Sequence, residues 1–245
     1  MPTVASRQHL RREEELALAR RLAELHRLDI ASPNPGWNLA TFEHRSASAG
    51  CTLLAVRSGE HSDLRIRIAE VSGLNPVAAT LAAQCGLELL RRNRTGELGE
   101  LNEYFLANPP GDHSMIAAGT LRFDAADSTW GGRFAGLHPP LAIHPDGGVE
   151  QLRGSGPFLG LTRTTFPIVH GRLRPGGRLL LLAGSGAGEV RTELLAHLMN
   201  APPSPLDEFM RRLGSDLAAD LEPGFGLSLI GIERNRLPVP GAELE

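Results

Sequence analysis

The spacing of apolar residues changes from a helical to a strand period near residue 36. Four leucines in residues 8–28 recur at the spacing of one helix face, so we expect a helix there. Residues 33–36, Pro-Asn-Pro-Gly, end that helix and form a turn. Beyond the turn, residues 37–42, 52–56 and 64–71 are typical of strands, and in the last of these aliphatic residues alternate with arginine.

The rest of the chain contains blocks of helices and blocks of strands. We expect short strands separated by turns from residue 114 onward, and the strand over residues 179–182 is expected to be buried. The remaining elements predicted from the pattern are helices over residues 75–92, 97–107, 189–199 and 206–221, and strands over residues 179–182 and 226–232. Blocks of this kind, without strict alternation, favour an α+β fold over a doubly wound parallel sheet.

We expect one domain over residues 31–233, after a lead-in helix within residues 1–30 and before a polar tail of residues 234–245. The chain has 245 residues, of which 41% are hydrophobic and 22% charged, as in an ordinary globular protein. The formal net charge of −3 argues against a nucleic-acid partner. All 25 cationic residues are arginine, which excludes a Schiff-base lysine and a Walker-type lysine.

The sequence predicts a cytoplasmic protein that does not cross a membrane. Cys51 and Cys85 are the only cysteines, and their separation matches no metal-binding spacing, so a reducing compartment is expected. The N-terminal residues lack the apolar core of a signal peptide. No apolar stretch approaches the about 18 residues that a membrane span requires.

Three short motifs follow one another along the chain: Pro-Gly-Trp at residues 35–37, Ala-Gly-Leu-His-Pro-Pro at residues 135–140 and Gly-Pro-Phe-Leu-Gly at residues 156–160. In this order and spacing they resemble motifs of the SpoIIE branch of the PPM-type metal-dependent serine/threonine phosphatases. Residues 35–37, Pro-Gly-Trp, are similar to the start of that family's first strand. Residues 135–140, Ala-Gly-Leu-His-Pro-Pro, are similar to its Asn-Ala-Gly-His-Pro-Pro segment, and residues 156–160, Gly-Pro-Phe-Leu-Gly, follow at the family's spacing. The resemblance covers about residues 13–233. It implies a four-layer sandwich of two packed, mainly antiparallel sheets flanked by helices.

The resemblance also implies a site for two Mg²⁺ or Mn²⁺ ions, held by aspartates at four places. In this chain those places hold Cys51, Glu70, Ser185 and Gly226. Such ions prefer carboxylate oxygens, whereas a thiol is a soft ligand, a serine hydroxyl is neutral and glycine has no side chain. At about 4 Å and an effective dielectric near 20, each lost ionic partner removes roughly 4 kcal/mol of attraction. We therefore expect no bound metal, no catalytic residues, and a pseudophosphatase.

Two alternatives stay open. An active phosphatase could use a rearranged site with replacement carboxylates, for which Glu43, Asp63 and Glu189 are the candidates. Alternatively, the loop formed by Gly184, Ser185, Gly186 and Gly188 lies between a predicted strand and a predicted helix, where a small anion or nucleotide can bind. A tight turn that fills a former metal pocket is the simpler interpretation of this loop.

The expected partners are proteins. The family resemblance implies bacterial partner-switching signalling, in which the protein would hold a phosphorylated partner or an anti-sigma-type regulator. The leucine stripe of residues 8–28 either covers the rest of the chain or forms a homodimer.

Overall fold

The computed structural model describes residues 14–15, 17–18, 36–44, 51–58, 63–73, 77, 80, 83, 98–109, 114–199 and 202–235. Its elements in chain order are β1 (Trp37–His44), β2 (Cys51–Ser58), β3 (Leu64–Gly73), α3 (Leu98–Ala107), β4 (Ser114–Asp124), β5 (Thr129–Ala135), β6 (Leu141–Ile143), β7 (Val149–Gln151), β8 (Val169–Arg172), β9 (Arg178–Ala183), α4 (Arg191–Met199), α5 (Leu206–Ala219) and β10 (Leu227–Arg234). The helices predicted over residues 8–28 and 75–92 lie mostly outside the described residues. Seven of their residues are described, and all seven are helical.

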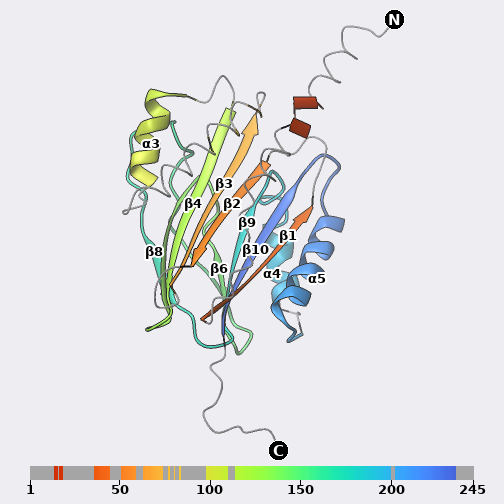
Figure 1. Ribbon diagram of the computed structural model, residues 1–245. Helices are drawn as coiled ribbons and strands as arrows, with labels where there is room; N and C mark the ends of the chain where they lie inside the picture. The colour runs from red at the N-terminus through yellow and green to blue at the C-terminus, as the bar shows by residue number, and fades with distance from the viewer. Residues whose placement is uncertain are drawn as a thin grey trace, which may run out of the picture.

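The strands form two five-stranded sheets (Figure 1). We call them the β9 sheet, with order β1-β10-β9-β6-β7, and the β4 sheet, with order β2-β3-β4-β5-β8. All neighbouring strands within both sheets are antiparallel. The α+β class and the mainly antiparallel pairing implied by the resemblance are confirmed.

The alternating pattern of β3 places its two sets of side chains on opposite faces of the β4 sheet. Ile66 and Ile68 are fully buried in the core between the two sheets. Arg65 and Arg67 therefore belong to the other, outer face, because successive side chains of a strand point to opposite sides. Burial of one such aliphatic side chain stabilises the fold by about 1.5–3 kcal/mol.

The predicted buried strand is β9, and helices cover its outer side. Leu179 and Leu181 face the β4 sheet, whereas Leu180 and Leu182 belong to a second core that contains residues of α4 and α5. Because both faces of β9 are covered, its leucines are continuous and do not alternate with polar residues.

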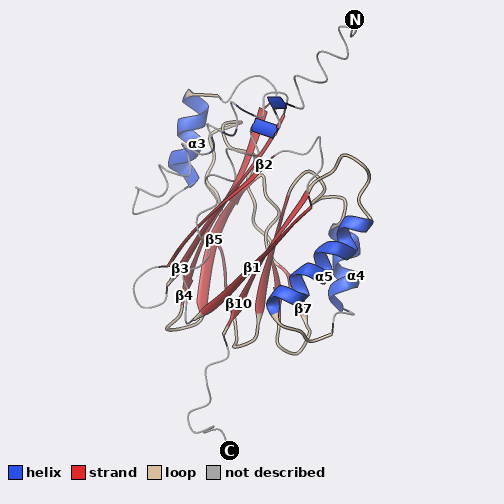
Figure 2. Cartoon of the chain, turned by 45° about the vertical axis from the view of Figure 1, so that its right-hand side comes forward, coloured by secondary structure: helices blue, strands red, loops and turns tan. Residues whose placement is uncertain are grey.

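The molecule has four layers, with helices outside both sheets (Figure 2). On α5, an apolar stripe faces the β9 sheet and consists of Leu206, Phe209, Met210, Leu213 and Leu217. On the other side, α3 buries Leu98, Leu101 and Phe105 against one end of the β4 sheet. Among the described helices, none is both long and apolar enough to cross a membrane.

β4 differs from the short strands expected after residue 114, because it runs from Ser114 to Asp124. Its Ala-Ala-Gly centre has low strand propensity. The packing explains why small residues are needed there: a Cβ at Gly119 would lie 2.9 Å from Cγ2 of Ile68. Close approach to neighbouring side chains, and not local propensity, decides the composition of this strand.

Candidate functional site

Three of the four positions where the family resemblance places metal ligands meet at one end of the space between the sheets. Glu70 lies near the end of β3 and is paired with Thr52 on β2. The turn after β9 contains Ser185, and Gly226 immediately precedes β10. The backbone of Cys51 is the next position along β2 from Thr52 and pairs with Val71.

Hydrogen bonds join the two sheets at this end. The backbone N–H of Gly184 donates to Oε2 of Glu70 at 2.8 Å. The hydroxyl of Ser228 on β10 donates to Oγ1 of Thr52 at 3.0 Å. Residues at and beside the positions where the resemblance places metal ligands thus bond directly across the gap between the sheets. We call these two contacts the inter-sheet clasp.

Ser185 and Gly226 form a local contact on the β9-sheet side. The backbone N–H of Gly226 donates to Oγ of Ser185 at 3.1 Å, and the N–H of Gly186 donates to the carbonyl of Gly226 at 2.9 Å. A Cβ at Gly184 would lie 2.5 Å from the carbonyl oxygen of Gly226. The two segments are therefore in close backbone contact.

These residues do not fit a binuclear Mg²⁺ or Mn²⁺ centre. Glu70 supplies a carboxylate, but one of its oxygens accepts the Gly184 N–H. The Ser185 oxygen accepts a hydrogen bond as well, and Gly226 supplies no side chain. Within the part of the chain that the structure describes, no group of three or more His, Cys, Asp or Glu residues could hold a metal ion.

The three replacement carboxylates are not gathered around Glu70. Asp63 precedes β3 by one residue and bonds to Arg122, with Oδ2 and Nη2 3.2 Å apart. It is seven positions before Glu70 along the strand, which corresponds to about 23 Å. Glu189 is exposed in the turn before α4. Only Glu43, which is opposite Ser228 on β1, lies toward the same end of the strands.

The glycine loop uses several of its backbone donors within the protein. The N–H groups of Gly184, Gly186 and Ala187 donate to Glu70, to Gly226 and to the carbonyl of Gly184, respectively. Gly184 has a φ of 103°, in the region that favours glycine. Because these amides already bond within the protein, fewer of them are available to an anion than the sequence pattern suggests. The hydrogen-bond pattern is that of a packed turn.

His138, within the Ala-Gly-Leu-His-Pro-Pro segment, lies beside the loop. A Cβ at Gly188 would lie 3.9 Å from Nε2 of His138. Burial lowers the pKa of His138, and the positive charge of Arg191 lowers it further. The neutral form of the His138 imidazole is therefore favoured.

Glu70 makes the stability of the protein depend on pH. Burial raises the pKa of Glu70 above its ordinary value of 4.5, and the Gly184 hydrogen bond lowers it by a smaller amount. The folded state therefore holds this proton more tightly than the unfolded state. The associated stability is fully present below the ordinary pKa and is lost as pH rises through the raised folded pKa.

We expect Glu70→Gln to remove this loss and to be more stable than the wild type at neutral pH, because the amide oxygen still accepts the Gly184 N–H. Near pH 4 the advantage should disappear. Urea denaturation at both pH values measures the difference. Glu222→Gln, at an exposed position, is the matched control and should change little at either pH. Equal destabilisation of Glu70→Gln at both pH values would contradict the prediction.

The chain matches no family model and no curated protein, but it is similar in structure to several phosphatase domains. The SiaA-PP2C domain of Pseudomonas aeruginosa superposes with a TM-score of 0.71 and 16% identity, over 96% of this chain and 100% of that domain. The phosphatase domain of SpoIIE from Bacillus subtilis gives a TM-score of 0.60 and 11% identity, over 86% and 98%.

A third similar structure contains the RsbU and RsbW domains of Rv1364c from Mycobacterium tuberculosis. It has a TM-score of 0.65 and 18% identity, and the alignment covers 84% of this chain but 63% of that longer one. Likeness at such identities shows the fold. The protein therefore has the fold of the SpoIIE-like, PPM-type phosphatase domains, as the sequence motifs implied.

Proposed function

We propose that this protein is a pseudophosphatase, which regulates other proteins by binding them and does not hydrolyse phosphate esters. The observation that carries the proposal is the hydrogen bond that the Glu70 carboxylate accepts from the backbone of Gly184. Glu70 supplies a carboxylate at the former ligand positions, and that carboxylate accepts a backbone hydrogen bond from the opposite sheet. A metal ion at this carboxylate would compete with the bond that joins the sheets.

The charge at the site supports the same proposal. Two divalent cations bring about four positive charges into a small volume. At about 4 Å and an effective dielectric near 20, each missing anionic ligand removes roughly 4 kcal/mol of attraction. Neutral Ser185 and side-chain-free Gly226 do not replace it. Glu70 alone leaves most of the cationic charge uncompensated.

Several proteins with similar structures are described as parts of regulatory protein systems, which favours protein partners for this chain as well. One similar structure combines an RsbU with an RsbW domain, another is described in connection with the bacterial stressosome, and a third, PppA, is described as a key regulatory component of T6SS in Pseudomonas aeruginosa. By this analogy we propose that the protein works in the cytoplasm in a partner-switching pathway, on a phosphorylated protein or an anti-sigma-type regulator.

Titration calorimetry with Mn²⁺, together with a phosphatase assay on a phosphoprotein, tests the proposal. RsbX provides a positive control, because its structure contains magnesium. We expect RsbX to bind Mn²⁺ and this protein to show neither a binding isotherm nor turnover. Turnover that Glu70→Ala and Glu43→Ala both abolish would instead establish an active phosphatase with a rearranged site.

A further inference from the structure

Arginines form a row across the outer face of the β4 sheet. Arg57 on β2 is directly opposite Arg65 on β3, and Arg65 is directly opposite Arg122 on β4. The same line continues through Gly131 on β5 to His170 on β8. Directly opposite residues of antiparallel strands project from the same face. We call Arg57, Arg65, Arg122 and His170 the arginine row.

The arginine row lies on a part of the outer face that does not pack against α3. Four positions further along the strands, Ala69 and Ala118 are opposite each other and belong to the core that includes residues of α3. Between this apolar part and the arginine row lie Arg67 and, on β5, Arg133. Figure 1 shows α3 beside one end of the sheet only. Each strand of the β4 sheet thus contributes a basic side chain to this face. On β5 that side chain is Arg133, which is level with Arg67 and not with the arginine row.

The arginine row is accessible, and within the described part of the chain its charge is only partly neutralised. Arg57 and His170 are exposed, the Arg122 side chain is 62% exposed, and Arg65 is half-buried. Asp63 pairs with Arg122 at 3.2 Å. Two further carboxylates, Asp124 and Asp127, lie at the neighbouring β4–β5 turn and accept backbone hydrogen bonds within it.

Three directly opposite arginines are unfavourable for the sheet itself. Like charges facing each other on neighbouring strands destabilise the pair. The protein as a whole is acidic, with a net charge of −3, so this concentration of positive charge is local. An anionic partner that binds this cationic surface would offset the repulsion among its arginines.

We propose that the arginine row is a docking surface for an acidic segment of a partner protein, rich in aspartate and glutamate. Four strand spacings separate β2 from β8, which gives a row about 19 Å long, the span of a short peptide. Guanidinium groups bind carboxylates through paired hydrogen bonds. The inference concerns a different face from the Glu70 site and does not depend on whether that site is active.

A protein segment fits this surface better than nucleic acid does. Of the residues that make up the row, His170 alone has a ring on which a base could stack, whereas proteins that bind single strands stack successive bases on several rings. The carboxylates of Asp63, Asp124 and Asp127 border one side of the row, and they would repel a continuous phosphate backbone. A short acidic segment can lie along the row without reaching that border.

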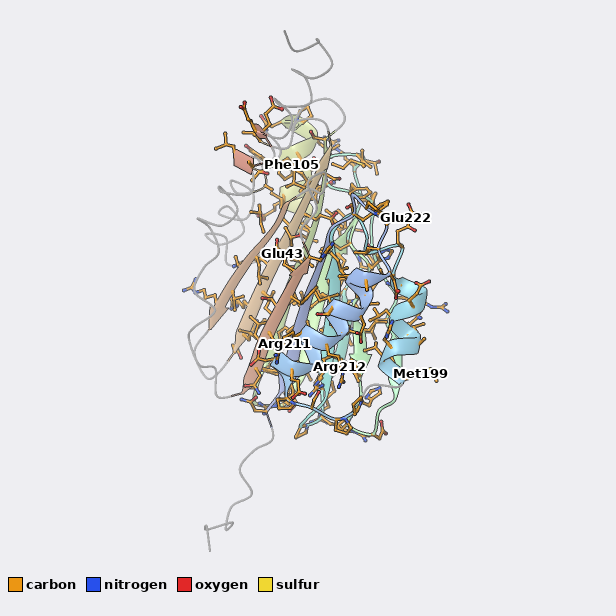
Figure 3. The ribbon with its side chains drawn as sticks, turned by 90° about the vertical axis from the view of Figure 1, so that its right-hand side faces the viewer. Glu43, Phe105, Met199, Arg211, Arg212 and Glu222 are labelled. Atoms are coloured by element: carbon orange, nitrogen blue, oxygen red, sulfur yellow. The ribbon has the colours of Figure 1, made fainter. Side chains whose placement is uncertain are left out.

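Fluorescence anisotropy with a labelled oligoglutamate peptide tests the proposal on the full chain at low salt. The test variant is Arg57→Gln, Arg65→Gln, Arg122→Gln. Its matched control changes three other exposed arginines in the same way, Arg153→Gln, Arg174→Gln, Arg211→Gln, with the same change in net charge. Arg211 lies on α5 (Figure 3), which covers the other sheet.

We expect the peptide to bind the wild type and the control within about twofold of each other, and the test variant to bind about tenfold more weakly or worse. Equal losses in both variants, or no binding by the wild type, would overturn the proposal. So would tighter binding of a DNA oligonucleotide or phosphatidylserine vesicles that the test variant alone loses, because the row would then serve another class of partner.

A second measurement separates docking from a structural role. If the arginine row exists for binding, Arg65→Gln leaves the thermal stability unchanged or raises it, since it removes charge repulsion with Arg57 and Arg122. A marked fall in the unfolding temperature of this variant would show that the row supports the sheet, and the proposal would fail.

Discussion

Placing aspartate at all four positions where the resemblance puts metal ligands should convert this protein into one that Mn²⁺ stabilises. In the variant Cys51→Asp, Glu70→Asp, Ser185→Asp, Gly226→Asp, carboxylates replace the neutral groups at the end of the strands. Without metal we expect a large loss of stability, because the new charges repel one another and Asp is too short to keep the Glu70–Gly184 bond. With Mn²⁺ at about one hundred times its Kd, binding restores about 2.7 kcal/mol.

Thermal unfolding with and without Mn²⁺ measures this effect. For a chain of this size, the restored free energy corresponds to a rise in Tm of roughly 5–10 °C. The wild type should show no such rise. The variant that keeps Gly226 but changes the other three positions is the intermediate control and should respond less. A folded fourfold variant whose Tm does not rise with Mn²⁺ would mean that these four positions do not form a metal-binding pocket.

The second large effect is expected at Gly214 on α5. A Cβ added there would lie 2.2 Å from Cγ and Cδ1 of Phe42 on β1, so α5 or the ring must move. Alanine normally stabilises a helix relative to glycine by about 1 kcal/mol. We nevertheless expect Gly214→Ala to destabilise the protein by about 2 kcal/mol, because overpacking of this kind costs about 1–3 kcal/mol.

Chemical denaturation of four variants, Gly214→Ala, Gly99→Ala, Phe42→Ala and the double variant Phe42→Ala, Gly214→Ala, checks this prediction. Gly99→Ala on α3 is the control, since a Cβ there meets nothing within 4 Å, and it should be neutral or stabilising. Adding Phe42→Ala to Gly214→Ala should cost less than the sum of the two single changes, because the ring and the methyl group compete for one space. Strict additivity would show that the close approach is not the cause.

The sequence predicted the elements well where local pattern decides them. The alternation in β3 and the leucine run in β9 gave the right strands, because one or both faces are buried as the pattern requires. The ends were less accurate: the helix expected from residue 189 begins at Arg191, since residues 184–190 form a packed turn. Turns were expected between the strands after residue 114, and two of the observed turns contain glycines with positive φ, Gly147 and Gly176.

The contacts at the site could not be predicted from local pattern. The resemblance located Glu70, but its bond to Gly184 joins residues that are 114 positions apart and requires the stacking of the two sheets. Likewise, Thr52 and Ser228 carry no local signal, and their hydrogen bond spans 176 positions. The arginine row likewise could not be predicted from local pattern. Arg65 is visible in the alternation of β3, whereas its neighbours Arg57 and Arg122 become adjacent only through strand register.

The inter-sheet clasp has a consequence for the cell. The bonds from Gly184 to Glu70 and from Ser228 to Thr52 are made within the chain. Under the proposed function, we expect a fold closed by such bonds to keep its shape when a chelator is added or when manganese is scarce. Its binding to a partner would then not depend on the supply of metal.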